Sequence, residues 1–310
     1  MGSRGGISPA LVRVLRPLFC MRPWMLRFRR KEYDLSRRTL VMGVLNITPD
    51  SFSDGGQFFE GDRAVEQGRR LAEEGADILD VGGESTRPGS QPLPVEEELR
   101  RVIPVIEELH AKISIPISID TRKATVAQRA LQAGAEMVND ISALRYDEDM
   151  AEVVSRWKVP VALMHMRGQP ETMQADTHYD DLIGEIREFF RERLAYAASR
   201  GIFREQVILD PGIGFGKSLE EGHNLVLLKH LRSFQDLGQP LLIGTSGKAF
   251  LGRILNLPPG EREEGTLATV AVAIQNGANI VRVHEVKRTR RVAQVADAIL
   301  RSTAEQEPEA

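Results

Sequence analysis

The alternation of short apolar runs with amphipathic helical patterns is the feature that most constrains the fold of this chain. Eight apolar runs of strand length follow residue 39, at 40–45, 77–82, 115–119, 136–139, 159–164, 206–210, 240–244 and 279–283. Helical spacing follows each of them, near 62–74, 95–110, 122–133, 148–156, 179–200, 220–236, 263–276 and 288–302. Repeated β–α units of this kind predict a parallel sheet with helices packed against it.

Two folds of parallel strands match this alternation, a closed (β/α)8 barrel and a doubly wound open sheet. Barrel enzymes place functional residues at the carboxyl ends of many strands, whereas an open sheet binds its ligand at one switch point. Nearly every apolar run here ends in polar residues, namely Asn46, Glu84, Asp120, Asn139, His165, Asp210, Ser246, Arg282 and His284. We therefore predict an α/β fold of the TIM barrel type.

The composition favours a soluble, globular protein that binds small molecules. Of the 310 residues, 42% are hydrophobic and 27% are charged, and the formal net charge is −3. The sequence has no basic stripe typical of nucleic-acid binding and no apolar run of membrane-spanning length. Its single cysteine, Cys20, excludes an internal disulfide and a cysteine-built zinc site. We expect a cytoplasmic protein that binds neither nucleic acid nor membrane.

The two ends of the chain differ from its middle. Residues 1–25 are rich in arginine, and the first acidic residue is Glu32. An organelle transit peptide has this bias, but arginines interrupt any apolar core, and a true start at Met21 or Met25 would also account for it. We expect a basic, disordered extension at 1–25, one barrel domain at 26–303 and a disordered tail at 304–310.

Seven segments at the strand ends together resemble one enzyme family. The first is MGVLNITPDSFSDGG (42–56), which begins within the first strand and continues into the polar loop after it. The others are GGESTRPG (82–89), SIDT (118–121), NDIS (139–142), LDPGIGFGK (209–217), GTSGKAFLG (244–252) and VRVHEV (281–286). In type, order and spacing they resemble dihydropteroate synthase, a pterin-binding barrel enzyme, from about residue 25 to residue 303.

The resemblance implies a transferase of folate biosynthesis. Such an enzyme condenses 6-hydroxymethyl-7,8-dihydropterin diphosphate with 4-aminobenzoate, giving 7,8-dihydropteroate and diphosphate, with Mg²⁺ as cofactor. Sulfonamides would compete with 4-aminobenzoate. Two alternatives share the pterin site: a methyltransferase that uses a methylfolate and a corrinoid protein, and a non-catalytic pterin-binding paralog. A metal hydrolase is disfavoured because the six histidines form no His-x-His pair.

The pterin would lie at the ends of the strands that carry Asp120, Asn139 and Asp210. A pterin edge presents adjacent N–H donors, and a carboxylate is a two-pronged acceptor for them, which suits Asp210. Lys248 would donate to the ring carbonyl. The expected pterin contacts are Asp120, Asn139, Met164, Asp210, Phe215 and Lys248.

The diphosphate requires cationic or amide donors and a metal ion. Arg282 and His284 lie two residues apart on one strand and so point the same way. The amide oxygen of Asn46 suits Mg²⁺, a hard cation that keeps several waters, and in the family this asparagine contacts metal and diphosphate. The expected diphosphate contacts are Asn46, Thr86, Arg87, Arg282 and His284.

The expected reaction is displacement of diphosphate from the pterin methylene carbon by the amine of 4-aminobenzoate. Stabilisation of the leaving group and of charge on the ring would carry the rate, without a covalent enzyme intermediate. The expected catalytic residues are Asp120, Asp210, Lys248, Arg282 and His284.

We expect 4-aminobenzoate to bind over the pterin, beneath loops 47–60 and 84–92, which contain glycine hinges. Phe52 would help to enclose its ring, and backbone N–H groups near Ser246 would receive its carboxylate. The expected contacts are Thr86, Arg87, Pro88, Phe215, Ser246 and Lys248.

Two residues near this site depart from the family pattern, and two others have an expected structural role. Gly247 stands where the family usually has arginine, and Glu285 where it usually has aspartate. We expect Asp80 and Glu84 to be buried acceptors that brace the second loop.

The patterns at 263–276 and 288–302 are apolar enough for barrel packing or a dimer contact, and the resemblance favours a homodimer.

Overall fold

The structure, a computed structural model, describes residues 24–47 and 57–302. Three expectations therefore fall wholly or largely outside the described residues: the basic extension, most of the first lid with Phe52, and the C-terminal tail. The proposed domain boundaries stay predictions, although Met25 already lies in a strand.

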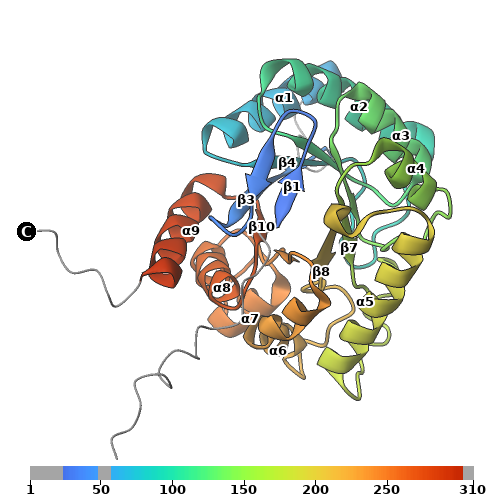
Figure 1. Cartoon of the computed structure of the whole chain (residues 1–310). Helices are drawn as coiled ribbons and strands as arrows, with labels where there is room; N and C mark the ends of the chain where they lie inside the picture. Colours follow the sequence, from blue (N-terminus) through green and yellow to red (C-terminus); the bar gives the residue numbers. More distant parts are fainter. Residues whose placement is uncertain (1–23, 48–56, 303–310) are drawn as a thin grey trace, which may run out of the picture.

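Eight parallel strands form the predicted barrel (Figure 1). They are β3 (Leu40–Asn46), β4 (Ile78–Gly82), β5 (Ile117–Asp120), β6 (Met137–Asp140), β7 (Val161–Met164), β8 (Val207–Asp210), β9 (Leu242–Ile243) and β10 (Ile280–Val283). Their order is β8-β7-β6-β5-β4-β3-β10-β9, and a bridge between Leu209 and Leu241 joins the two ends. The barrel, rather than the open sheet, is confirmed.

Helices surround the strands as the periodicity predicts. They are α1 (Gln57–Glu73), α2 (Val95–Lys112), α3 (Ala124–Ala133), α4 (Met150–Trp157), α5 (Leu182–Ser199), α6 (His223–Lys229), α8 (Glu263–Gln275) and α9 (Val286–Arg301). The predicted helix at 220–236 divides into α6 and the 3-10 helix η4 (Leu231–Leu237). Two short helical elements were not predicted, η3 (Arg204–Gln206) and α7 (Ala249–Leu255). In the described part of the chain, no helix has the length and apolar character that a membrane span requires.

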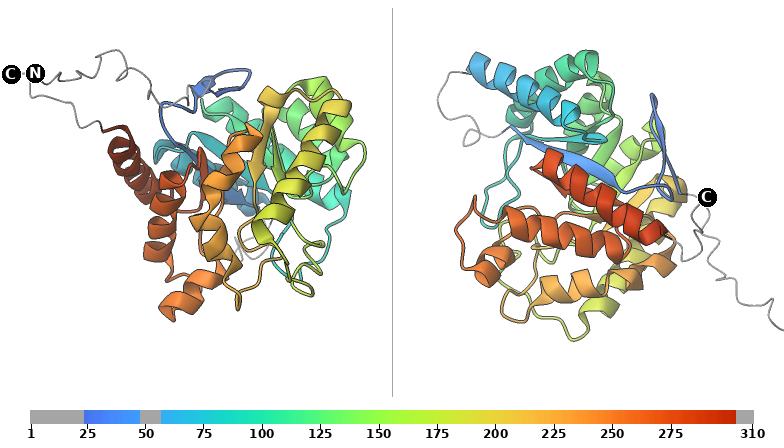
Figure 2. Two further views of the ribbon diagram at one scale, coloured as in Figure 1. Left: turned by 60° about the horizontal axis from the view of Figure 1, so that its bottom comes forward. Right: turned by 90° about the vertical axis from the view of Figure 1, so that its left-hand side faces the viewer.

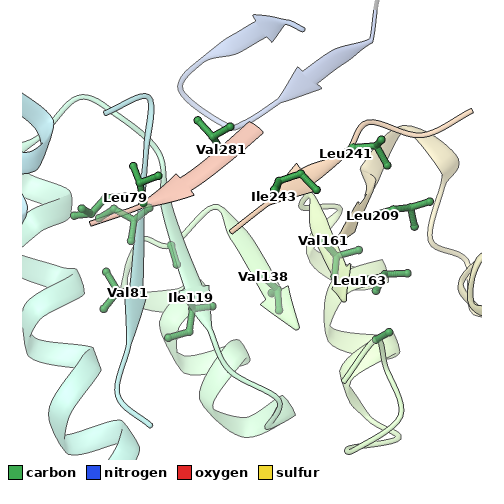
Figure 3. Packing of buried hydrophobic residues seen from close by; sticks show 14 of the residues in the cluster. Leu79, Val81, Ile119, Val138, Val161, Leu163, Leu209, Leu241, Ile243 and Val281 are labelled. Atoms are coloured by element: carbon green, nitrogen blue, oxygen red, sulfur yellow. The ribbon is translucent and has the colours of Figure 1, made fainter. Parts of the chain in front are cut away.

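The outward-facing strand residues pack against the helices in the main hydrophobic core (Figure 3). Val81, Ile119 and Leu163 lie in the same buried cluster as the helix residues Ile106 and Phe190. Because side chains alternate along a strand, the remaining strand residues face the barrel interior.

A hairpin of β1 (Met25–Arg27) and β2 (Glu32–Asp34), which was not predicted, covers the amino-terminal end of the barrel (Figure 1, in blue). Its Leu26, Phe28 and Tyr33 pack with interior residues such as Met42 and Ile208. Strands of three residues are too short to show a clear alternation, which explains the omission. The interior is thus apolar and closed at this end.

Along the strands, the interior changes from apolar to polar. Met137 is followed two residues later by Asn139, Ile208 by Asp210, and Ile280 by Arg282. Each pair faces the interior, so the polar members meet at the carboxyl end, opposite the hairpin. This is where barrel enzymes hold their active sites.

Candidate active site

Strand register places three predicted site residues, Asn46, Asp120 and Asn139, in one row across neighbouring strands. Asn46 lies opposite Gly82, Gly82 opposite Asp120, and Asp120 opposite Asn139. A Cβ atom on Gly82 would lie 3.7 Å from Asp120 Oδ2 and 3.8 Å from Asn46 Oδ1. The glycine therefore leaves the space between these two oxygen-bearing side chains open.

Arg282 crosses the barrel mouth to two carboxylates. Its Nε donates to Asp80 Oδ2 at 2.6 Å, and its Nη2 donates to Asp120 Oδ2 at 2.7 Å. Asn139 Nδ2 also donates to Asp80 Oδ2, at 3.0 Å. Asp80 is fully buried, as expected, and it fixes Arg282 and Asn139. Because these partners lie outside the second loop, the expectation that Asp80 braces that loop was wrong. Only Nη1 of Arg282 lacks a hydrogen bond to the described residues.

Burial shifts the ionisation of these groups. It raises the pKa of Asp120, and the Arg282 guanidinium acts against this rise. Burial alone would lower the pKa of Arg282, but Asp80 and Asp120 outweigh it, so the pKa is raised and the guanidinium stays charged.

Asp210 is the buried carboxylate at the end of β8, opposite Met164 of β7. Its Oδ1 accepts from the backbone N–H of Gly212 at 2.8 Å. Burial raises the pKa of Asp210 to about 6, while the Gly212 bond and the Lys248 charge act to lower it. A carboxylate held in this way is poised to accept donors from a ligand.

Lys248 and Phe215 lie against each other. Lys248 Nζ lies 4.2 Å from the centroid of the Phe215 ring, a cation–π distance. Burial lowers the pKa of Lys248 to about 8. Phe215 also packs on an apolar cluster of Ile141, Met164, Met166 and Met173.

Met166 and Met173 were not among the predicted site residues. Met166 lies two residues after Met164 at the end of β7, and a methionine there is as typical of core packing as of a ligand wall. Met173 comes from the long loop between β7 and α5, and no local pattern distinguishes it.

His284, expected at the diphosphate, lies beside Ser246, expected at the aminobenzoate carboxylate. Its Nδ1 is 2.9 Å from Ser246 Oγ. Local desolvation and then the charges of Arg282, Lys248 and Arg87 lower its pKa to about 4, although the residue as a whole is exposed. The imidazole is thus neutral at physiological pH and acts through hydrogen bonds rather than charge.

The second loop, predicted at 84–92, spans all of residues 83–94 between β4 and α2, and it is anchored at its base and exposed at its tip. Glu84 accepts from the backbone N–H of Leu93 at 2.9 Å and pairs with Arg122 and Lys123, so it braces the loop as expected. Thr86 is half-buried, whereas Arg87 and Pro88 are exposed. Gly89 donates to the carbonyl of Pro170 at 3.1 Å, which ties the tip to the loop after β7.

Gly247 adopts a left-handed backbone conformation, with φ of +65°. Its N–H donates to Thr266 Oγ1 at 3.1 Å. No described atom lies within 4 Å of the position that a Cβ would take, so space does not forbid a side chain there. The backbone conformation is what favours glycine.

Residues 24–47 and 57–302 contain no group of three His, Cys, Asp or Glu side chains that could hold a metal ion. The half-buried amide of Asn46 makes no hydrogen bond to a described residue, and its oxygen faces the space beside Asp120. A single hard oxygen fits Mg²⁺, which takes few protein ligands when a diphosphate supplies the rest.

Comparison with known proteins identifies the family. Residues 42–284 match the family model described as pterin binding enzyme. The chain is 50% identical to dihydropteroate synthase of Synechocystis over 270 residues, which cover 87% of this chain and 93% of that protein.

Solved structures agree with this match. The Xanthomonas albilineans dihydropteroate synthase with 4-aminobenzoic acid has a TM-score of 0.84 and 44% identity, and the likeness covers 91% of this chain and 100% of that one. The Yersinia pestis enzyme in complex with a sulfonamide drug also has a TM-score of 0.84, with 42% identity over 90% of this chain and 100% of that one. The expected family, enzyme class and function are confirmed: this chain belongs to the dihydropteroate synthases, the pterin-binding transferases of folate biosynthesis.

Proposed function

We propose that this chain joins 6-hydroxymethyl-7,8-dihydropterin diphosphate to 4-aminobenzoate at the carboxyl end of its barrel. One observation carries the assignment of the site. Asp120, Asn139 and Asp210, from three strand ends, are all buried at the polar end of one interior whose other end is closed. Buried polar groups of this kind are costly unless a ligand or a partner uses them.

In this proposal the aminopyrimidinone edge of the pterin binds Asp210, Asn139 and Asp120. The free Oδ2 of Asp210 and the amide oxygen of Asn139 accept its N–H groups. Lys248 donates to the ring carbonyl, and the ring lies between Phe215 and Met164. The apolar cluster around Phe215 supports this placement, because flat heteroaromatic rings bind well between apolar side chains.

Diphosphate is held by Arg282, His284, Asn46 and the Thr86–Arg87 segment. Arg282 has Nη1 left for an oxygen, while its other two donor atoms are fixed by Asp80 and Asp120. His284 donates through Nε2 as a neutral imidazole, since its Nδ1 faces Ser246. Bound Mg²⁺, held by Asn46, would neutralise charge on the leaving diphosphate.

Chemistry at the site is a single displacement. The amine nitrogen of 4-aminobenzoate forms a bond to the pterin methylene carbon as the carbon–oxygen bond to diphosphate breaks. The electron pair of that bond leaves with diphosphate, and the new secondary amine releases one proton to water. Asp120 and Asp210 stabilise positive charge on the ring, and Arg282 stabilises negative charge on the leaving group.

4-Aminobenzoate binds between Phe215, Lys248 and the second loop, with its carboxylate near Ser246. The X. albilineans relative, solved with 4-aminobenzoic acid, supports this substrate. The two alternatives are less favoured: the chain keeps Asn46, Arg282 and His284, which neither a corrinoid-dependent methyltransferase nor a non-catalytic paralog requires.

Competition tests this site directly. We expect a sulfonamide to raise the KM for 4-aminobenzoate without lowering kcat, in steady-state measurements of dihydropteroate formation with and without Mg²⁺. Asn46→Ala should raise the Mg²⁺ concentration needed for half-maximal rate, whereas the exposed-site control Asp236→Asn should not. Noncompetitive inhibition would place 4-aminobenzoate elsewhere, and an unchanged Mg²⁺ requirement would remove Asn46 from the metal site.

We also propose that two copies associate through α8 and α9, in a cytoplasmic enzyme. The two helices lie side by side on the outer surface (Figure 2) and enclose an apolar groove. Val295 and Ile299 are 61% and 63% exposed there. Exposed aliphatic residues gathered on one face are typical of an interface between subunits.

Light scattering coupled to size exclusion tests the dimer. Val295→Glu combined with Ile299→Glu should give a monomer, whereas Phe203→Glu, at an equally exposed apolar residue outside the groove, should leave the dimer intact. A wild-type monomer at micromolar concentration would overturn this part of the proposal.

A further inference from the structure

Lys217, the last residue of the LDPGIGFGK motif, has no role in the site described so far. Its side chain is only 1% exposed, which is unusual for lysine, and it lies in the loop between β8 and α6. The same loop carries Phe215, the aromatic wall of the proposed aminobenzoate site.

The ammonium group of Lys217 has three acceptors. Its Nζ donates to the carbonyl of Phe215 at 2.8 Å and to the carbonyl of Gly212 at 3.2 Å. The third contact, at 3.0 Å, is with Nδ1 of His165, which follows β7. Lys217 thus joins both ends of the 212–215 turn to the neighbouring strand.

His165 is itself held firmly, so it can serve as an anchor. It is buried, and its ring packs edge-on against Phe189 of α5 with centroids 4.8 Å apart. Its backbone N–H donates to the carbonyl of Asp210 at 2.8 Å. Burial, and then the charge of Lys217, lowers the pKa of His165, so Nδ1 is available as an acceptor.

Contacts other than these bonds also restrict the backbone of residues 212–216. Gly212, at φ +71°, lies against the carbonyl oxygen of His165, and a Cβ on Gly216 would lie 2.8 Å from Arg167 Cβ. Tyr179 donates to the carbonyl of Gly216 at 2.9 Å, and Asn224 accepts from Gly214 at 2.7 Å. Among the described residues, only Lys217 donates a hydrogen bond to the carbonyl of Phe215.

We propose that Lys217 is a positioning residue that fixes the Phe215 ring beneath Lys248 and so sets the affinity for 4-aminobenzoate. It does not touch the substrates. The pterin depends less on this loop, because its edge binds Asp120, Asn139 and Asp210 at three strand ends and Phe215 covers only one face of its ring. Loss of the Lys217 bonds should therefore affect the second substrate more than the first.

Charges around Lys217 agree with a role that depends on its protonation. Burial lowers the pKa of Lys217 to about 7, Asp210 acts to raise it, and Lys248 and Arg167 act to lower it. A neutral amine has two N–H groups for the three acceptors, so one of the three bonds loses its donor when Lys217 is deprotonated.

The test uses a double-mutant cycle in the full-length enzyme and rests on the proposed function. Lys217→Met should raise the KM for 4-aminobenzoate about tenfold and leave the Kd for the pterin diphosphate within about threefold. Phe215→Leu should do the same, and the double variant should be no worse than the worse single variant, since both changes remove one wall. Lys217→Gln, which keeps two N–H donors, should give a smaller rise, and Lys229→Met, at an exposed lysine of α6, none.

Multiplicative effects of Lys217→Met and Phe215→Leu would overturn the proposal, as would an equal loss of affinity for both substrates. If neither Lys217 variant folds, the residue is purely structural and the proposal fails. The proposed function is judged separately, by product formation in the wild type and by pterin affinity in Asp210→Asn. Unchanged pterin affinity in Asp210→Asn, together with the expected cycle here, would count against the proposed pterin site and leave the role of Lys217 standing.

Discussion

The replacement of Asp210 by asparagine should weaken pterin binding and stabilise the protein at the same time. Asparagine keeps an oxygen for the Gly212 N–H, so the local turn is preserved. It removes the charge whose burial raises the pKa of Asp210 to about 6. Because the variant loses the two-pronged acceptor, we expect pterin diphosphate to bind at least about tenfold more weakly.

The stability change follows from proton linkage. The folded-state pKa, about 6, lies above the ordinary value of 3.8, so the unfolded state holds Asp210 ionised more readily. This group therefore favours folding most below pH 4, and its contribution is lost as pH rises through about 6. Two pKa units correspond to about 3 kcal/mol of unfolding free energy. Relative to the wild type, Asp210→Asn should therefore gain this much stability between pH 4 and pH 8.

Urea unfolding at several pH values, together with calorimetric titration of the pterin diphosphate, measures both effects. The difference in unfolding free energy between variant and wild type should grow from pH 4 to pH 7 and then level off. Asp236→Asn, at an exposed carboxylate paired with Arg187, should alter neither the pH dependence nor the affinity. Parallel stability curves would refute the raised pKa, and unchanged affinity would remove Asp210 from the pterin site.

Three further predictions address other parts of the site. Arg282→Lys should lower kcat/KM about 100-fold, because lysine lacks the fork that bridges Asp80 and Asp120; a loss below threefold would contradict this bridging role. The kcat/KM for pterin diphosphate should fall below about pH 6, as Asp210 is protonated, and above about pH 8, as Lys248 loses its proton; a flat profile from pH 5 to 9 would contradict both assignments. Gly247→Ala should cost about 1 kcal/mol in thermal unfolding because its φ is +65°, and a neutral effect would show that this conformation is not retained.

Much of the fold could be predicted because the barrel is built from local signals. Each strand is a short apolar run and each large helix has its own periodicity, so all eight strands were identified from residues near in sequence. The hairpin β1–β2 and the seven-residue α7 were missed because elements this short show little periodicity. Their stability comes from tertiary packing, which the sequence pattern does not display.

The site was predictable as a set of strand ends but not as a network. Polar residues after each strand indicated which side chains would gather at the barrel mouth. The sequence did not indicate that Asp80 would hold Arg282, since the two are 202 positions apart and meet only when the barrel closes. The sequence also did not indicate the hydrogen bond between Lys217 and His165. Lys217 reaches His165 only because its loop follows a path that depends on glycines with positive φ.

Simultaneous measurement of diphosphate and 7,8-dihydropteroate in one reaction tests whether the enzyme couples diphosphate release to bond formation with 4-aminobenzoate. Purified enzyme would be supplied with the pterin diphosphate and Mg²⁺, with and without 4-aminobenzoate. We expect equal amounts of both products when 4-aminobenzoate is present, and almost no dihydropteroate when Asp210→Asn replaces the wild type. Diphosphate release without dihydropteroate, or equal turnover by the variant, would contradict this expectation.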